Sequence, residues 1–295
     1  DEIISKNAKN IYLNLSENNY VSIKDDGRGI PTDPHKKFKN KTALEIVLTT
    51  LHAGGKFNNK VYNTSGGLHG VGLSVVNALS SNLEVKVYRK GVEYSQKYNQ
   101  GIAKGKVKKS KCNIKNKGTS ISFQPDKEIF NDTIFDPKKI YEILKTKAYL
   151  VKGANIHWKC SKRIINNKNI PENDFFSFNN GIKDYLKNNT KNKNKLFEEI
   201  YYDEIKLDNS DEKVELAINF NENEESSIDT FCNSIVTNFG GTHEISMKNA
   251  IMKSVRFFAK HNQISKISNV SQQDFFEYSN IILSLYVSNP SFEGQ

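Results

Sequence analysis

The sequence of 295 residues predicts an α+β protein of two domains, and three observations support this fold class. Short segments with alternating apolar and polar residues recur between residues 83 and 123, which is typical of antiparallel strands with one buried face. Apolar residues at helical spacing follow at 137–151. After N-N-G at 179–181, a turn signal, a second series of strands and helices begins. We therefore predict domains at 1–180 and 181–295.

Further elements are predicted on both sides of that boundary. A strand around 156–158 closes the first sheet, and a hairpin or extended segment at 164–178 leads to the boundary. Trp158 and His157 have no convergent partners in the sequence, so we interpret them as core or strand-surface residues. The second domain is predicted to contain a short helix at 182–186, strands at 214–220 and 230–236, and a long helix at 247–258.

The composition indicates a globular protein without a membrane span. Hydrophobic residues make up 37% of the chain, and the mean hydropathy is −0.62 with no apolar run near twenty residues. The first residues lack the pattern of a signal peptide. Cys112, Cys160 and Cys232 are isolated, without C-x-x-C spacing, which favours reduced structural thiols and argues against a zinc site. We therefore expect a cytoplasmic protein.

A net charge of +10 favours a polyanionic partner. Lysine runs at 104–117 and 187–195 contribute to this charge, but they lack interleaved aromatic residues. Such runs are usually solvated loops, so neither run by itself predicts a DNA contact. Attraction to phosphates that does not depend on sequence is still expected, with a steep salt dependence.

A glycine-rich phrase, D-D-G-R-G-I-P at 25–31, follows a strand pattern in which Val21 and Ile23 are apolar. The carboxylate of Asp25 would therefore emerge where a sheet ends and a loop begins. Such a carboxylate can accept a hydrogen bond from the amine of adenine, and glycines without a Cβ let the backbone approach a flat base. Taken alone, the phrase is also a common turn composition.

A second phrase, S-G-G-L-H-G-V-G at 65–72, precedes a helical pattern that includes Leu73, Val76 and Leu79. Free N–H groups and the positive end of the dipole at a helix start suit a polyphosphate. The phrase lacks the Gly-Lys-Ser/Thr of a Walker A loop, and its order G-x-x-G-x-G differs from the dinucleotide fingerprint. Taken alone, it can also be a packing device.

Residues 42–52, between the two phrases, predict an amphipathic helix. Its apolar residues share one face: Leu44, Val47, Leu48 and Leu51. The following A-G-G-K-F at 53–57 combines a glycine hinge with a cation, as a mobile lid over a phosphate group requires. The three features in this order predict a nucleotide pocket.

Residues 1–101 resemble the ATPase domain of a type IIA DNA topoisomerase B subunit. The phrases L-H-A-G-G-K-F at 51–57 and S-G-G-L-H-G-V-G-L-S-V-V-N-A-L-S at 65–80 carry the resemblance beyond the shorter cores found in Hsp90, MutL and histidine kinases. P-T-D-P-H-K-K-F-K-N-K-T-A-L-E at 31–45 is more similar to the topoisomerase IV branch of this family than to the gyrase branch. The resemblance implies a Bergerat-type ATP-binding α/β sandwich, with helices on one face of a mixed, mostly antiparallel sheet.

The resemblance also implies roles for matching residues around the base. Asp25 would bind the adenine amine, with Gly29 lining the base and Ile30 and Pro31 packing beside it. Thr119, in K-G-T-S-I-S-F at 117–123, would support the base alongside Asp25. Without the resemblance, Thr119 would be interpreted as an ordinary strand residue.

Other implied roles concern the surroundings of the base and the phosphates. Asp1 would lie near the water network on the adenine side, and Glu2 would pair with Arg28 as a brace. The residues that would wrap the phosphates are Gly67, Leu68, His69, Gly70, Val71 and Gly72, with Lys56 and Tyr62 reaching in from the lid.

Further family residues are expected beyond the two ends of the sequence. The family helix before the adenine strand has the pattern E-x-x-x-N-x-x-D-E, so the general base Glu and the Mg²⁺ ligand Asn are expected upstream of Asp1. Glu45, between Leu44 and Ile46 on a helix, is interpreted as a solvated or capping residue and not as a replacement base. Gln295 matches the glutamine that approaches the terminal phosphate, and the sensor lysine is expected two residues later.

The second half of the chain resembles the family's transducer domain, a ribosomal-protein-like α/β fold. G-G-T-H-E at 240–244 matches the glycine turn that opens a long helix. D-F-F-E-Y at 274–278 departs from the family's D-x-R-E-G-L, and we expect this departure to affect the local loop and not the nucleotide pocket.

The resemblance implies an ATP-hydrolysing DNA topoisomerase that uses ATP and Mg²⁺. Nucleotide binding would close the lid and dimerise two ATPase domains into a gate that traps DNA, and an A-type subunit would complete a heterotetramer. Topoisomerase IV is the first interpretation and gyrase the alternative. Two other classes stay open: a MutL-like or Hsp90-like clamp, and a non-catalytic nucleotide-binding or DNA-binding module.

Overall fold

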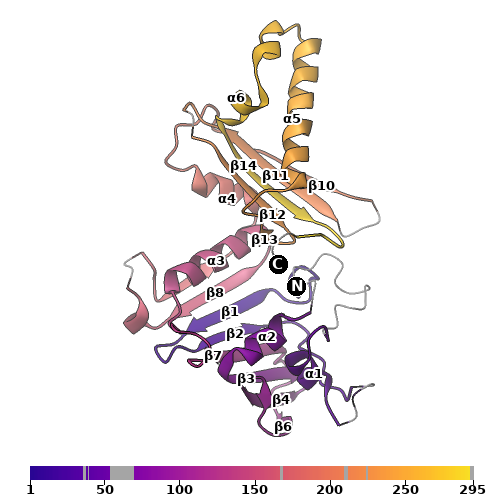
Figure 1. Cartoon of the computed structure of the whole chain (residues 1–295), viewed down its shortest axis with the longest axis vertical. Helices are drawn as coiled ribbons and strands as arrows, with labels where there is room; N and C mark the ends of the chain where they lie inside the picture. Colours follow the sequence, from indigo (N-terminus) through magenta and orange to yellow (C-terminus); the bar gives the residue numbers. More distant parts are fainter. Residues whose placement is uncertain are drawn as a thin grey trace. The chain divides into compact units, whose positions relative to one another are not determined.

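The chain forms two compact units, which we call unit 1 (Asp1–Asn179) and unit 2 (Asn180–Gln295). The computed structural model describes residues 1–35, 38, 40–53, 70–166, 169–208, 212–223 and 225–292. Each unit contains one sheet with helices packed against it (Figure 1). None of the helices in these ranges is both long and apolar enough to cross a membrane.

Unit 1 contains a nine-stranded sheet in the order β5-β4-β3-β7-β2-β1-β8-β9, with β6 also paired to β4. The strands are β1 (Asn10–Leu15), β2 (Val21–Asp25), β3 (Ser80–Arg89), β4 (Val92–Asn99), β5 (Ile102–Ala103), β6 (Lys108–Lys111), β7 (Gly118–Pro125), β8 (Asn155–Cys160) and β9 (Asn173–Phe176). All neighbours are antiparallel except β1 and β8. Because β9 pairs beyond β8, the prediction that the strand at 156–158 closes the sheet was wrong.

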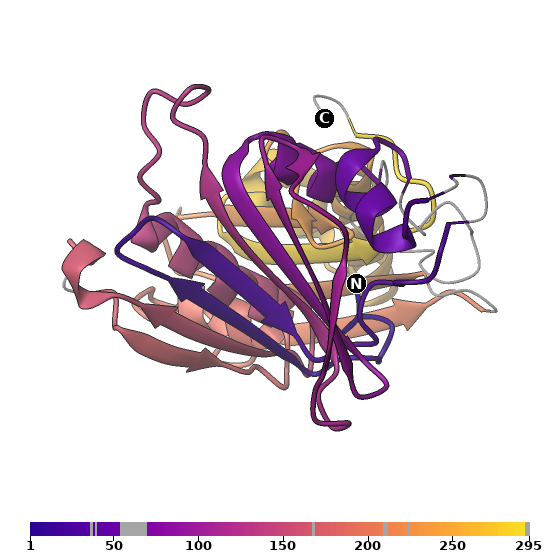
Figure 2. The same ribbon diagram turned by 90° about the horizontal axis from the view of Figure 1, so that it is seen from below.

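Three helices pack on one face of this sheet: α1 (Ala43–Thr49), α2 (Gly72–Ala78) and α3 (Pro137–Leu150). Seen from below, the twisted strands fan out and α1 and α2 lie on one side of them (Figure 2). Asp136 starts α3 by accepting hydrogen bonds from the N–H groups of Lys138 and Lys139, and Pro137 occupies the first turn.

Helix α1 is shorter than the sequence predicts. Thr42 caps its start by accepting a hydrogen bond from the Glu45 N–H at 3.2 Å, and the helix ends at Thr49. Leu51, predicted on the buried face, therefore lies beyond the helix and is 57% exposed. Ile46 is buried instead, together with Leu44 and Leu48.

The core of unit 1 consists of two clusters on the helix-covered face. The first lies under α3 and includes Leu13, Leu15, Val21, Ile156 and Trp158. The second lies under α1 and α2 and includes Leu44, Leu48, Leu83, Val85 and Val87. Trp158 is buried and donates its indole N–H to the Pro171 carbonyl at 2.8 Å, which confirms it as a core residue. The centre of the sheet lies between the two clusters.

Unit 2 contains a five-stranded sheet in the order β10-β11-β14-β12-β13. Its strands are β10 (Tyr201–Lys206), β11 (Lys213–Phe220), β12 (Ser227–Cys232), β13 (Ile235–Val236) and β14 (Ser279–Tyr286). The strand predicted at 230–236 is two strands, because Asn233 and Ser234 turn the chain with φ of 49° and 62°. Strands β10 and β14 were not predicted.

Three helices belong to unit 2: α4 (Ile182–Asn189), α5 (Thr242–His261) and α6 (Gln272–Phe276). The described residues also form two 3₁₀ helices, η2 (Lys162–Ile164) in unit 1 and η3 (Ser265–Asn269) in unit 2. A capping box between Ser271 and Asp274 starts α6. Phe276, one of the residues that depart from the family pattern, is buried in the core of this unit.

All three cysteines are free thiols, two of them buried. Burial raises the pKa of Cys160 to about 11 and also raises the pKa of Cys232, so both stay protonated near neutral pH. Buried, protonated thiols act as small apolar groups. The predicted structural role fits both residues.

Leu150 and Ile143, both on α3, allow a matched test of the core of unit 1. Leu150 is 2% exposed, and Leu150→Ala should lower the free energy of unfolding by about 2–5 kcal/mol because it leaves a cavity. Ile143 is 57% exposed, and Ile143→Ala should change this free energy by about 0.5 kcal/mol or less. Urea unfolding followed by the fluorescence of Trp158, the single tryptophan, measures both. Equal losses would contradict the assigned packing.

Candidate functional site

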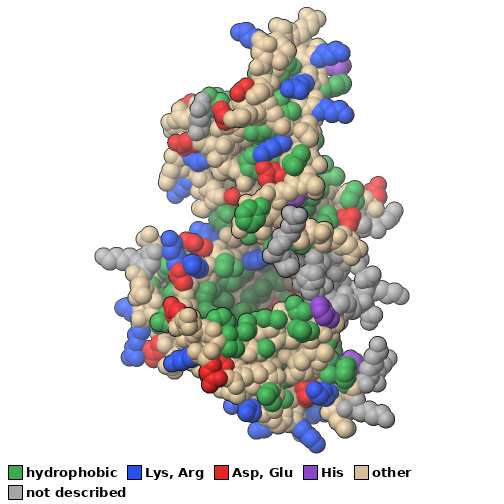
Figure 3. Space-filling view, viewed as in Figure 1, with side chains coloured by type: hydrophobic (Ala, Val, Ile, Leu, Met, Phe, Trp, Pro, Cys, Tyr) green, Lys and Arg blue, Asp and Glu red, His purple; other side chains and the backbone are tan. Residues whose placement is uncertain are grey.

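The strip of sheet between the two core clusters is open to solvent. Ile23 lies on the helix-covered face of β2, near the centre of the sheet, yet its side chain is 40% exposed. Asp25 lies two residues further along β2 on the same face. A hollow with hydrophobic walls is visible on unit 1 in the space-filling view (Figure 3). An exposed isoleucine at a sheet centre, beside a carboxylate, indicates a binding surface for a partly apolar, partly polar ligand.

Asp25 is half-buried and bonded only to backbone groups among the described residues. Its Oδ1 accepts a hydrogen bond from the Gly27 N–H at 2.8 Å, and the Thr119 N–H is also bonded to the carboxylate. Burial raises the pKa of Asp25, with further increases from Glu2 and Asp26, while the two backbone bonds oppose the increase. The carboxylate is thus poorly solvated and has acceptor capacity left for a ligand.

Gly118 brings the start of β7 directly against Asp25. A Cβ on Gly118 would lie 2.0 Å from the backbone oxygen of Asp25, and its φ is +104°. Both facts permit only glycine at this position. The close approach places the next residue, Thr119, beside Asp25. This geometry explains why a threonine in the site follows directly after a glycine.

Gly29 and Thr119 fix the loop that follows Asp25. Gly29 has a φ of +74°, and a Cβ there would lie 2.9 Å from Val87 Cγ1. Thr119 is buried, and its hydroxyl accepts a hydrogen bond from the Ile30 N–H at 3.1 Å. Ile30 packs against the second core cluster. Pro31 follows at the surface.

Glu2 and Arg28 form the ion pair expected from the sequence. Arg28 Nη2 lies 2.7 Å from Glu2 Oε1, and the Arg28 N–H and Nε bond to Glu2 Oε2 at 2.9 and 3.2 Å. A Cβ on Gly27 would lie 2.7 Å from the same Oε2. Asp1 is exposed, and its carbonyl accepts a hydrogen bond from the Ser5 N–H. Glu2 therefore fixes the loop from outside.

Asp26 and Arg89 hold the site in place but were not predicted from the sequence. Asp26 accepts hydrogen bonds from the N–H groups of Lys9 and Asn10 and from the Asn10 side chain, at 2.8 to 2.9 Å. Burial alone would raise the pKa of Asp26, but these bonds lower it below the ordinary value. Arg89 Nη1 donates to the Gly29 carbonyl at 2.8 Å. The doubled aspartate was the only signal available for Asp26.

The second glycine phrase is described only from Gly70 onward. Gly70 has a φ of +60°, and α2 begins at Gly72 after Val71, whose side chain makes no capping bond. A Cβ on Gly72 would meet no atom of the described residues within 4 Å, so none of them covers this side of the helix start. The other predicted site residues, Lys56, Tyr62, Gly67, Leu68, His69 and Gln295, lie outside the described residues.

Comparisons with known proteins show which families the chain resembles. Residues 2–129 match the family of histidine kinase-, DNA gyrase B- and HSP90-like ATPases, and residues 181–295 match the DNA gyrase B family. The B subunit of DNA topoisomerase 4 from Rickettsia felis is 42% identical over the whole chain. The ATP-binding domain of Francisella tularensis topoisomerase IV, solved with a small-molecule inhibitor, is 30% identical with a TM-score of 0.79, and the alignment covers all of this chain and 76% of that one.

The chain belongs to the type IIA DNA topoisomerase B subunit family. The 43K ATPase domain of Thermus thermophilus gyrase B, solved with an aminocoumarin, also has a TM-score of 0.79, at 28% identity, covering the whole chain and 74% of that domain. The predicted α+β fold class is thereby confirmed. The chain spans 45% of the length of the Rickettsia relative.

Two glycines of this type IIA B-subunit chain allow a matched test of the site geometry. Gly118→Ala should lower the free energy of unfolding by about 2–5 kcal/mol, because the new Cβ overlaps the Asp25 backbone and the φ is positive. Gly72→Ala should change it by about 1 kcal/mol or less, in the stabilising direction, since the site is open and helical. Thermal and urea unfolding measure both. A neutral Gly118→Ala would contradict the close approach.

Proposed function

We propose that unit 1 is the ATP-binding domain and unit 2 the transducer domain of a bacterial topoisomerase IV-like protein. The observation that carries this proposal is the half-buried Asp25 carboxylate in an open apolar strip, held by backbone bonds from Gly27 and Thr119. A flat base with an exocyclic amine fits that combination of one acceptor and apolar walls. Because residues 2–129 match a family of ATPases, we identify this ligand as the adenine of ATP.

In this proposal each described residue acts through its own contacts. Asp25 accepts a hydrogen bond from the adenine amine, and Gly29, held by Val87 and Arg89, lets the backbone lie against the base. Ile30 and Pro31 pack beside it. Thr119 holds the loop closed through the Ile30 N–H. The Glu2–Arg28 pair braces the loop, with Asp1 next to it.

The phosphates are proposed to lie at the start of α2. Gly70, Val71 and Gly72 would donate backbone N–H groups there, together with Gly67, Leu68 and His69, while Lys56, Tyr62 and Gln295 would approach the terminal phosphates. The described residues contain no group of three or more His, Cys, Asp and Glu side chains that could hold a metal. Mg²⁺ is proposed to enter with the nucleotide, where it would neutralise charge on the phosphates.

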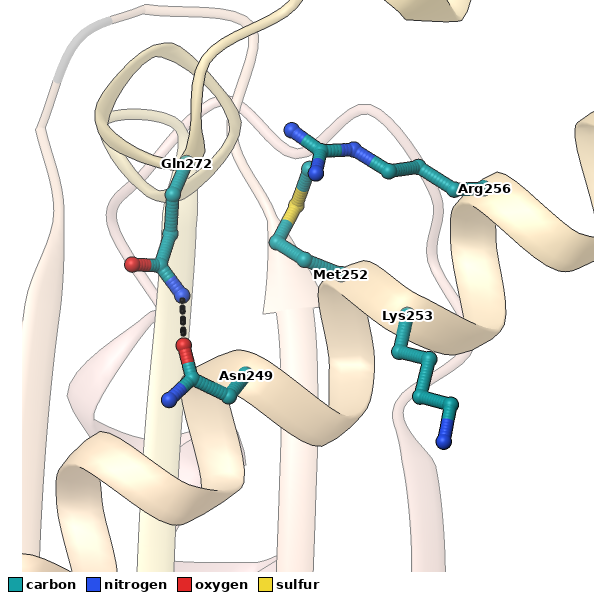
Figure 4. A pocket seen from close by; sticks show the side chains of 5 residues that line it. All are labelled: Asn249, Met252, Lys253, Arg256 and Gln272. Carbon is teal, nitrogen blue, oxygen red and sulfur yellow. Dashed lines mark hydrogen bonds between the residues drawn. The ribbon is translucent and has the colours of Figure 1, made fainter.

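Unit 2 presents a basic helix that fits a DNA partner. After Glu244, α5 contains Lys248, Lys253, Arg256 and Lys260 and no acidic residue. In Figure 4, Asn249, Lys253 and Arg256 project from α5, and Gln272 of α6 donates a hydrogen bond to Asn249 Oδ1 at 3.1 Å. These residues line a cavity of about 320 Å³. Lys248 is paired with Glu244 at 2.6 Å, and the other cations of α5 can bind phosphates in a salt-dependent way.

The proposed cycle couples nucleotide binding to DNA passage. ATP would dimerise two ATP-binding domains and close a gate around DNA, hydrolysis would reopen the gate, and an A-type subunit would complete the heterotetramer in the cytoplasm. The 42% identity to the Rickettsia felis topoisomerase 4 relative supports topoisomerase IV. Gyrase is the second candidate, because the gyrase and topoisomerase IV structures have the same TM-score.

Asp25→Asn tests the nucleotide site. We expect the affinity for a non-hydrolysable ATP analogue to fall by about 100-fold, because a charge-assisted hydrogen bond to the adenine amine is lost and the new amide NH₂ opposes that amine. Isothermal titration calorimetry measures the affinity. Asp132→Asn, in an exposed loop, is the control and should bind as the parent does. An unchanged affinity in Asp25→Asn would remove Asp25 from the site.

The pKa of Asp25 predicts how nucleotide affinity depends on pH. The carboxylate accepts the adenine amine only when ionised, and burial raises its pKa. Protonation therefore begins at a higher pH than for an ordinary aspartate, so affinity should fall on acidification before exposed aspartates titrate. Calorimetry from neutral pH downward measures this. The adenine-independent affinity for inorganic triphosphate should show no such decline, and an equal decline for both ligands would contradict the assignment.

A further inference from the structure

The face of the unit 1 sheet that points away from the helices carries its own pattern of side chains. Helices α1, α2 and α3 all pack on the face that contains Trp158 and Val85. Residues alternate between the two faces along each strand. Tyr12 and Phe175, on the opposite face, are 42% and 52% exposed. We call this opposite face the back face.

One row of side chains crosses eight strands of the back face. Consecutive residues in this row are direct cross-strand partners, so all of them point to the same side. In order, the row consists of Phe175, His157, Tyr12, Lys24, Ser120, Lys86, Ser95 and Lys108. Neighbouring strands lie about 4.8 Å apart, so the three lysines repeat at about 10 Å. The row is a line of cations that ends in a group of rings.

The charge of the back face is positive beyond this row. The next row adds Lys159 and Lys97. Two acidic residues lie at these neighbouring positions: Glu84 pairs with Lys86 of the row at 3.8 Å and offsets part of its charge, and Glu93 is hydrogen bonded to Tyr88. Five lysines thus face two glutamates, which gives a polyanion a linear track.

The rings at the end of the row form an exposed stack. Tyr12 and His157 lie with ring centroids 4.4 Å apart and an interplanar angle of 12°, and the His157 and Phe175 centroids lie 5.0 Å apart. Lys24 Nζ lies 5.5 Å from the centroid of Tyr88, a fourth ring on this face. Core packing does not account for these rings, since the apolar clusters are on the other side of the sheet.

We propose that the back face of unit 1 binds a single strand of nucleic acid. Lysines along a line contact successive phosphates, and aromatic side chains stack on bases, which is how proteins bind unpaired strands without regard to sequence. A duplex keeps its base faces stacked inside, so the exposed rings favour a strand with unpaired bases. The linear order of rings, lysines and serines across the sheet carries this proposal.

This surface is separate from the Asp25 site, although both use β2. Lys24 and Asp25 are consecutive in the strand, so their side chains point to opposite faces of the sheet. A nucleotide on the helix side and a strand on the back face do not compete for space. Nucleotide affinity is therefore an independent readout of folding for back-face variants.

The test uses the whole chain with Lys253→Gln and Arg256→Gln in every variant, so that α5 contributes equally. Fluorescence anisotropy measures binding of an oligo(dT) of about twelve nucleotides over a series of salt concentrations. The variant Lys24→Gln/Lys86→Gln/Lys108→Gln should bind at least about tenfold more weakly, with a salt slope lower by about 2. The matched control Lys127→Gln/Lys138→Gln/Lys139→Gln removes the same charge elsewhere on unit 1 and should keep most of the affinity.

A second variant separates stacking from charge. Tyr12→Leu should weaken binding of oligo(dT) by about tenfold and leave binding of an abasic deoxyribose-phosphate oligomer unchanged. Equal binding by the row variant and its control would overturn the proposal. So would an equal loss for a duplex of the same length, which would make the face a duplex contact. Loss of self-association in the row variant, with oligo(dT) affinity unchanged, would overturn it too and assign the face to a second copy of the chain.

Discussion

The close approach between Gly118 and the backbone of Asp25 is the constraint on which the candidate site depends. It forces the start of β7 against the end of β2, and that contact places both the Thr119 N–H and its hydroxyl within reach of the D-D-G-R-G-I loop. Asp26 fixes the same strand end from the other side by bonding to the start of β1. Asp25 is thus positioned by backbone contacts on both sides and keeps its carboxylate available.

The described helices leave the centre of the sheet uncovered where the candidate site lies. The two core clusters are complete without Ile23, because α3 covers β1 and β8 while α1 and α2 cover β3 and β4. A helix over the middle would bury Ile23, at a gain of roughly 1.5–3 kcal/mol for a full side chain. Ile23 is not buried by the fold itself, so a ligand that covers it can gain this free energy on binding. The proposed nucleotide site therefore rests on exposed apolar surface beside a half-buried carboxylate.

Most elements of unit 1, and the loop at Asp25, could be predicted from the sequence because their signals are local. Alternation located β2 and β7, and apolar residues at helical spacing located α3, since both periodic patterns depend on residues close together in the sequence. Strand β14 was missed because it is buried along almost its whole length and does not alternate. The turn at Asn233-Ser234 was missed because these two turn residues stand alone within an otherwise apolar run, with no glycine or proline beside them. Arg89 and Asp26 act through long-range contacts, which have no local pattern.

The register of β2 determines which side chains appear on both faces of the unit 1 sheet, at the candidate site and at the back face. Because side chains alternate strictly, a slip of one residue in β2 would move Asp25 to the back face and Lys24 into the proposed nucleotide site. The bonds from the Asp26 carboxylate to the N–H groups of Lys9 and Asn10 oppose such a slip, because they hold the end of β2 against the start of β1. Residues that contact neither proposed ligand therefore determine what each face presents. Asp26, within the first glycine phrase, thus acts by holding the strand in register and not by contacting the proposed nucleotide.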